Sequence, residues 1–212
     1  SAAFFPGVVP VDAPRGVFTR DVSLSTPGWH STGLFAPAGE VVSIRVDGEV
    51  EGLRVRIGCH TDHLWHHRDW KRVPDISREW LLVGDKTNVA SAFGGLVYID
   101  VPRGRIGAAR VTIGGVVEAP RFVLGSTTHE EWLASRSSPA PWGELESGKV
   151  IVSVPSEHLR TLDDPTQVMR VWDRISDAHA TLATIPLEPE RPHRYVADVQ
   201  ISAGYMHSGY PI

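Results

Sequence analysis

Four of the chain's ten histidines gather just after its single cysteine, where residues 59–67 read CHTDHLWHH. Histidine nitrogens, a thiolate and a carboxylate are common zinc donors, so a structural zinc site is one interpretation. The other is a polar loop at a sheet edge, with Trp65 and Trp70 packed over it. Gly58 ends a predicted strand just before, and nothing caps a helix here. We therefore expect a loop at the rim of a substrate site.

A second candidate is the pair His129-Glu130. A zinc-peptidase helix has the pattern H-E-x-x-H, because residues four apart share a face and the glutamate activates the metal-bound water. The fifth position here is Leu133, so the pattern fails. Glu130 and Glu131 instead suit the positive end of a short helix that Thr127 or Thr128 can cap.

Other catalytic patterns are absent or undetermined. The sequence has no G-x-S-x-G elbow, P-loop or dinucleotide fingerprint. A Ser-His-Asp triad depends on the spatial arrangement of its residues and not on their order, so the sequence alone does not exclude one. Exposed tryptophans can stack on sugar rings. Trp172 is expected in a core, and each of the others is a packing residue or a glycan contact. The seven tryptophans are Trp29, Trp65, Trp70, Trp80, Trp132, Trp142 and Trp172.

Composition narrows the class of protein. The 212 residues are 42% hydrophobic and 22% charged, with a net charge of −4 that argues against a general nucleic-acid binder. One cysteine excludes an internal disulfide framework. No apolar run reaches the roughly 18–20 residues of a membrane helix, so no transmembrane segment is expected. The 20 glycines and 16 prolines favour short strands and turns.

The pattern of apolar residues predicts a mainly β protein. Residues 53–58 alternate strictly, with Leu53, Val55 and Ile57 on one face, and similar short runs follow without intervening helices. We expect an extended lead-in at 1–27, an antiparallel β-sandwich at 28–125, and the start of an α/β unit at 126–212.

The α/β unit has one strong helix signal, in which Asp164 can cap, Pro165 fits the first turn, and Gln167 completes a D-x-x-Q capping box. The residues expected on its apolar face are Val168, Val171, Trp172, Ile175 and Leu182.

Several sequence segments, in the same order along the chain, resemble one protein family. They are WHSTGLFAPAGE at 29–40, RIGCHTD at 56–62, FGGLVYI at 93–99, APWGELE at 140–146 and DVQISAGYMHSGYPI at 198–212. Together they are similar to the enhancin-like, mucin-targeting zinc metallopeptidases.

The resemblance implies a β-sandwich fused to a thermolysin-like (gluzincin) catalytic unit. In that family, zinc is held by an H-E-x-x-H helix and a downstream Glu, and the helix Glu moves the proton. This sequence reaches Ile212 before any such helix. We therefore expect zinc in the parent enzyme, with ligands downstream of Ile212. We assign no catalytic or metal-binding residue here and expect this chain alone to be inactive.

The resemblance also implies a substrate-side segment, because gluzincins bind substrate backbone along an edge strand near the zinc helix. Residues 204–211 are placed to resemble it. Tyr205, His207 and Tyr210 are the candidates to line the cleft and stabilise an oxyanion. Trp142 and Glu144 form a second, weaker pair. The alternative is an exposed loop whose aromatic residues pack on the remaining part of the enzyme.

The resulting hypothesis is the N-terminal part of a secreted or cell-surface zinc metallopeptidase that acts on glycoproteins such as mucins, with possible glycan contacts. Two rivals remain. One is a sandwich module that binds glycans or a protein. The other is a catalytically inactive family member that serves as an interaction scaffold, like eukaryotic relatives that associate with membrane channels.

Overall fold

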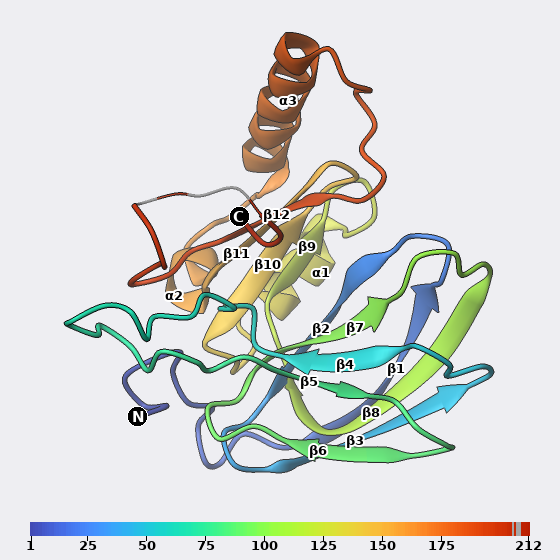
Figure 1. Ribbon diagram of the computed structural model, residues 1–212, viewed down its shortest axis with the longest axis vertical. Coiled ribbons are helices and arrows are strands. Elements are labelled where there is room, and N and C mark those ends of the chain that lie inside the picture. Colours follow the sequence, from blue (N-terminus) through green and yellow to red (C-terminus); the bar gives the residue numbers. More distant parts are fainter. Residues whose placement is uncertain (205, 207–208) are drawn as a thin grey trace.

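The computed structural model describes residues 1–204, 206 and 209–212. Most of its elements are strands, in two sheets (Figure 1). The prediction of a mainly β protein is therefore confirmed. The first sheet has the strand order β5-β4-β7-β2-β8-β3-β6, with β1 beside β8. Its strands are β1 (Gly16–Ser23), β2 (Gly28–Ala36), β3 (Val41–Asp47), β4 (Arg54–Ile57), β5 (Arg78–Leu81), β6 (Thr87–Ala90), β7 (Gly95–Val101) and β8 (Ala108–Glu118).

Alternating side chains explain why these segments form strands. Leu53, Val55 and Ile57 are fully buried, as their spacing predicts, while Arg54 is exposed. In β3 the buried residues also alternate with residues that face solvent. This period of two places aliphatic side chains in one core and polar ones in water.

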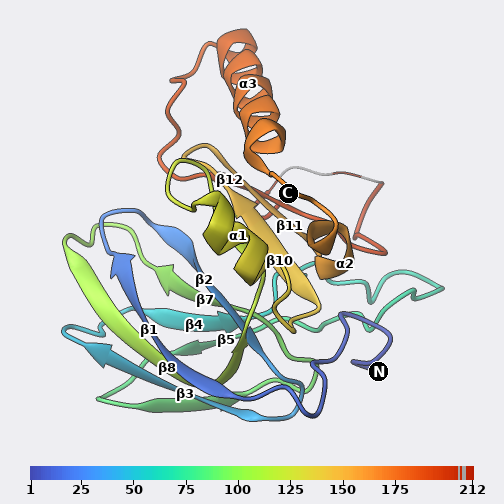
Figure 2. The ribbon, with the colours of Figure 1, turned by 180° about the vertical axis from the view of Figure 1, so that it is seen from behind.

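The expected sandwich of two separate sheets is not confirmed, because β8 belongs to both halves. Its longer part pairs with β1 and β3, and its end at Val117 and Glu118 pairs with β2. Gly115 allows the bend: its φ is +81°, and a Cβ there would lie 2.4 Å from the carbonyl oxygen of Val41. The strands therefore form one curved eight-stranded sheet that wraps around its core (Figures 1 and 2). A thermolysin-like unit is not confirmed either.

The second sheet has the order β12-β11-β10-β9. The central pair β10/β11 is antiparallel, and both outer pairs are parallel. Two short helices, α1 (His129–Ser135) and α2 (Ser156–Arg160), pack beside it (Figure 2). Thr128 caps α1 in a capping box with Glu131, so the pair His129-Glu130 begins a short helix. The strands are β9 (Arg121–Val123), β10 (Trp142–Glu146), β11 (Val150–Pro155) and β12 (His193–Val196).

The long helix α3 (Thr166–Ala183) forms where the sequence predicts a helix. Pro165, just before the assigned start, already has helical backbone angles and makes no side-chain capping bond of its own. The Asp164 carboxylate accepts a hydrogen bond from the backbone N–H of Thr166 at 2.8 Å. Because Pro165 is helical, this is the bond of a cap at Asp164, as predicted, whereas the part of the capping box assigned to Gln167 is not confirmed.

The predicted apolar face of α3 is only partly buried. Trp172 stacks on Tyr195 of β12, with ring centroids 4.9 Å apart, and Met169 is fully buried. The other predicted members stay exposed, because α3 projects away from the sheets (Figure 1). They are Val168, Val171, Ile175 and Leu182.

Within the described residues, no helix combines the length and apolar character that crossing a membrane requires.

Candidate functional site

The histidine-rich residues form a loop between β4 and β5, here called the histidine loop (residues 58–77). It lies beside the chain that leaves β12, here called the exit segment (residues 197–202) (Figure 1). Three histidines each place Nε2 near a backbone carbonyl oxygen: His60 near Ala197 at 3.1 Å, His66 near Ser202 at 2.7 Å, and His67 near Ile201 at 3.1 Å. A carbonyl only accepts, so each Nε2 carries the proton and donates.

Carboxylates complete this contact. Arg72 of the histidine loop and Asp198 of the exit segment form a buried ion pair, with Nε 2.9 Å from both carboxylate oxygens and Nη2 2.8 Å from Oδ2. The backbone N–H of Ser202 donates to Asp62 Oδ2 at 2.6 Å. Residues more than a hundred positions apart therefore fix the backbone of the exit segment.

Two buried residues at the start of the histidine loop, Cys59 and His60, are uncharged near neutral pH. Burial lowers the pKa of His60 to about 4, so its ring is uncharged near neutral pH. Burial, followed by the charge of Glu144, raises the pKa of the Cys59 thiol to about 12. Cys59 is thus a packing residue and not a nucleophile. In the part of the chain that the structure describes, no three His, Cys, Asp or Glu side chains gather as a metal site.

A buried ion pair lies within the second sheet and also contacts the first. Glu144 of β10 contacts Arg194 of β12, and both side chains are almost fully buried. Glu144 Oε1 also accepts hydrogen bonds from the hydroxyl of Tyr98 in β7 at 2.9 Å and from Ser153 at 2.7 Å. Burial alone would raise the pKa of Glu144, but Arg194 and the hydroxyl donors outweigh it and lower that pKa. Glu144 is therefore an ionised group held by protein partners.

Arg194 extends this network to the start of β2. Its Nη2 donates to the carbonyl oxygen of Trp29 at 3.2 Å and to Ser31 Oγ at 3.0 Å. The Trp29 ring then meets Tyr210 edge-on, with centroids 5.5 Å apart. The guanidinium carbon of Arg191 lies 3.6 Å from the centroid of the Tyr210 ring. Tyr210 is thus fixed between an aromatic ring and a cation.

The structure places the predicted cleft residues in different surroundings. Tyr210 is half-buried and lines a cavity of about 280 Å³ together with Trp29 and Arg191. Trp142 and Glu144 are buried and do not meet Tyr210. Trp142 Nε1 donates to the carbonyl oxygen of Pro6 at 2.7 Å, and its ring packs edge-on against His60. Tyr205 and His207 lie outside the described residues. The cleft role of these five residues stays a prediction.

Sequence reasoning missed the residues that hold Tyr210. Arg194 sits in a four-residue strand, and Arg191 lies in the linker before it, where nothing local marks either as important. Their partners come from β2 and β10, which are distant in sequence. Within β12, Arg194 is the buried residue, whereas Tyr195 and Val196 are half-buried and His193 is exposed, so the strand has no alternating pattern that marks it.

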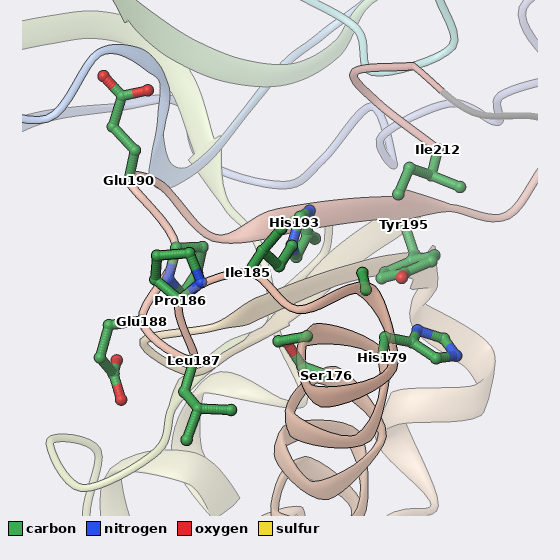
Figure 3. A pocket seen from close by; sticks show the side chains of 13 residues that line it. Ser176, His179, Ile185, Pro186, Leu187, Glu188, Glu190, His193, Tyr195 and Ile212 are labelled. Atoms are coloured by element: carbon green, nitrogen blue, oxygen red, sulfur yellow. The ribbon is translucent and has the colours of Figure 1, made fainter.

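A cavity of about 390 Å³ lies between α3 and β12 (Figure 3). His179 of α3, together with His193 and Tyr195 of β12, faces it, and the linker 185–190 supplies an apolar wall. Its lining is mostly aliphatic, and none of the described site residues Tyr210, Trp142 and Glu144 lines it.

Family comparisons match the chain along nearly its whole length. The N-terminal domain of M60-like peptidases matches residues 11–114, and Peptidase M60, enhancin and enhancin-like, matches residues 115–212. Fold and matched domains thus define the class as an M60-type peptidase region. The chain belongs to the enhancin and enhancin-like M60 peptidase family, as the resemblance in the sequence predicts.

Individual relatives are longer than this chain. Human TRPM8 channel-associated factor 2 is 41% identical over 100% of the chain, which spans only 23% of that protein. Pseudomonas aeruginosa IMPa, solved with an O-glycopeptide, shares the fold with a TM-score of 0.62 at 18% identity, covering 96% of this chain and 28% of that one. The M60 catalytic domain of Clostridium perfringens ZmpC, solved with the sialyl T antigen, shares the fold with a TM-score of 0.63 at 14% identity. That match covers 84% of this chain and 44% of the ZmpC chain.

Proposed function

We propose that this chain is the N-terminal part of a zinc metallopeptidase that acts on glycoproteins, and that the exit segment leads into one wall of its substrate cleft. The observation that carries the proposal is the ordering of the exit segment. Three histidine side chains, the Arg72–Asp198 ion pair and Asp62 all act on its backbone or its one buried carboxylate. Such preorganisation suits a segment whose backbone must meet a substrate.

The position of β12 supports this role. It is the outer strand of the second sheet, and the exit segment continues from its end. The outer edge of β12 is itself paired with Ile212, whose backbone bonds to both Arg194 and Val196. In this proposal an extended peptide therefore pairs with the backbone of the segment that covers β12 and not with β12, which gives affinity without selecting side chains. The chain near Tyr210 lies beside β12, where the backbone N–H of Ile212 donates to the carbonyl oxygen of Arg194 at 2.7 Å. In this proposal Tyr210 contacts substrate, whereas Glu144 and Trp142 act through the residues that they position.

The described residues do not fit a zinc ion, because no three donor side chains converge. We therefore derive no step through zinc in this chain and infer that it acts alone only as a binding and positioning region. The zinc ligands and the general base belong to an H-E-x-x-H helix and a further glutamate elsewhere in a longer protein. A secreted or cell-surface location and a mucin-like substrate belong to the same proposal. Its support is the O-glycopeptide and the sialyl T antigen bound by proteins of this fold.

A second candidate is a catalytically inactive scaffold or a module that binds glycans or a protein. The observation in its favour is the 41% identity to a TRPM8 channel-associated factor, whose name states association with a channel and not proteolysis. Both candidates use the same fold and differ in whether a bound glycoprotein is cut.

The test is incubation of the full-length parent protein, loaded with zinc, with one peptide in two forms, O-glycosylated and bare. Mass spectrometry then reads cleavage, and metal analysis reads the zinc content. Zinc-dependent cleavage of the glycosylated form supports the peptidase. Binding of the glycopeptide without cleavage favours the binding module. Failure of both, in a folded protein, contradicts the glycoprotein proposal.

A further inference from the structure

The cavity beside Tyr210 collects arginines from three parts of the chain. The cavity has a volume of about 280 Å³. Its lining includes Arg20 of β1, Arg121 of β9 and Arg191 of the linker before β12. Two carboxylates, Asp21 and Glu146, line it as well. Whether the cavity is positively charged depends on how these groups pair.

Both carboxylates have other partners. Glu146 pairs with Arg121, at 2.6 and 3.1 Å. Asp21 pairs with Arg110, at 2.9 and 3.3 Å, and Arg110 does not line the cavity. Among the described residues, no carboxylate lies within 4.0 Å of the guanidinium nitrogens of Arg20 or Arg191. Two positive charges at this cavity are therefore without an ion-pair partner in the described chain.

Arg20 is held in place by neutral groups. Its Nε donates to the carbonyl oxygen of Thr32 at 2.8 Å, and Nη1 donates to that of Thr19 at 3.0 Å. These bonds leave donors on the same guanidinium for another acceptor. Burial, and then the charge of Arg121, lowers the pKa of Arg20, and the more distant charge of Glu118 offsets only part of this. A bound anion would offset both the lost hydration and the repulsion between the two guanidinium groups.

Glycines of β2 make room for these side chains. A Cβ at Gly28, where φ is +99°, would lie 2.8 Å from Nη1 of Arg191. A Cβ at Gly33, where φ is +68°, would lie 3.0 Å from Cδ of Arg121. The backbone of β2 therefore lets both arginines lie directly against it, and the Tyr210 ring supports Arg191 from the other side at 3.6 Å.

We propose that Arg20 and Arg191 bind an oxyanion, the carboxylate or phosphate group of a ligand, in this cavity. A guanidinium offers a planar fork of N–H donors that matches the paired oxygens of either group. A cavity of about 280 Å³ suits a single acidic sugar or a phosphate and not an extended chain. The inference goes beyond the proposed function, since it requires neither zinc nor peptide cleavage.

The experiment titrates the ¹⁵N-labelled full chain with two probes, inorganic phosphate and N-acetylneuraminic acid, at low ionic strength. The side-chain Nε–Hε resonances of Arg20 and Arg191 report binding. We expect both to shift and saturate, and the tighter probe identifies the chemical source of the oxyanion. Arg20→Gln and Arg191→Gln should each weaken binding at least about tenfold. Arg20→Lys, which keeps the charge but loses the fork, should weaken it less.

The matched control is Arg170→Gln on the exposed surface of α3, which makes the same change in net charge and does not touch the cavity. It should change affinity less than about twofold, because only screened, long-range attraction is altered. Thermal unfolding of each variant confirms that it is folded. Resonances that do not saturate with either probe, or an equal loss of affinity in Arg170→Gln, would overturn the proposal.

Discussion

Arg72 and Asp198, which are far apart in sequence, form an ion pair with side-chain exposures of 0% and 4%. The pair joins the histidine loop of the first sheet to the exit segment beyond the second. Because both charges are buried, each depends on the other for compensation. The position of the exit segment is therefore tied to a loop of the first sheet that precedes it by more than a hundred residues.

Asp198→Asn removes one charge of this pair and leaves Arg72 buried without a counter-ion. We expect a loss of about 3–5 kcal/mol in the free energy of unfolding, or local release of the exit segment if that costs less. Denaturant unfolding and hydrogen exchange at residues 197–202 measure the two outcomes. Glu190→Gln, which breaks an exposed pair with Arg103, is the matched control and should change little. Equal effects in both variants would contradict this account.

His60 makes stability depend on pH. Its folded pKa of about 4 lies below the ordinary value of 6.5, so the unfolded chain binds more protons between these limits. The stabilisation is complete above about pH 6.5 and is lost as the pH falls toward 4. His60→Gln, which keeps a donor for Ala197, should flatten the unfolding free energy across that window. The exposed residue His158 offers the control. The free energy of unfolding of His158→Gln should depend on pH in the same way as that of the wild type.

The bend in β8 depends on Gly115. Gly115→Ala would put a Cβ 2.4 Å from the carbonyl oxygen of Val41 at a φ of +81°, so the backbone must shift. We expect destabilisation of at least about 2 kcal/mol. Gly39→Ala, at a φ of +77° with open space around it, isolates the cost of backbone conformation and should be milder. Thermal unfolding measures both. Equal losses would mean that the contact with Val41 does not matter.

Tyr210→Ala tests the predicted cleft in the full-length parent protein. Loss of the ring removes the surface on which Arg191 stacks, and we expect turnover of an O-glycopeptide to fall about tenfold with little change in melting temperature. Tyr210→Phe keeps the ring and isolates the hydroxyl. Unchanged turnover in Tyr210→Ala would remove this residue from the site.

Local patterns predicted much of the fold. The alternation at Leu53, Val55 and Ile57 and the cap at Thr128 both depend on neighbours within a few residues, and both form as expected. The exposed side of α3 could not be predicted, because periodicity places Val168 and Ile175 on one face without saying what covers it. The joining of the two halves of the eight-stranded sheet through β8 depends on a bend at Gly115, which is one of 20 glycines.

The candidate site shows the same limit. The sequence singled out Tyr210 and the histidines, but not what they contact. Glu144 meets Arg194 fifty positions later, and His66 meets the carbonyl oxygen of Ser202. Ion pairs and side-chain to backbone bonds at such separations follow from topology, and residue type alone does not encode them.

The central claim is that the exit segment leads into a wall of the substrate cleft, and hydrogen exchange on the full-length parent protein tests it most directly. Amide exchange is measured with and without an O-glycopeptide bound. The account predicts added protection on binding of the backbone amides at 197–202 and of those of Gly209, Tyr210 and Ile212. Protection confined to other parts of the protein, with these amides unchanged, would contradict it.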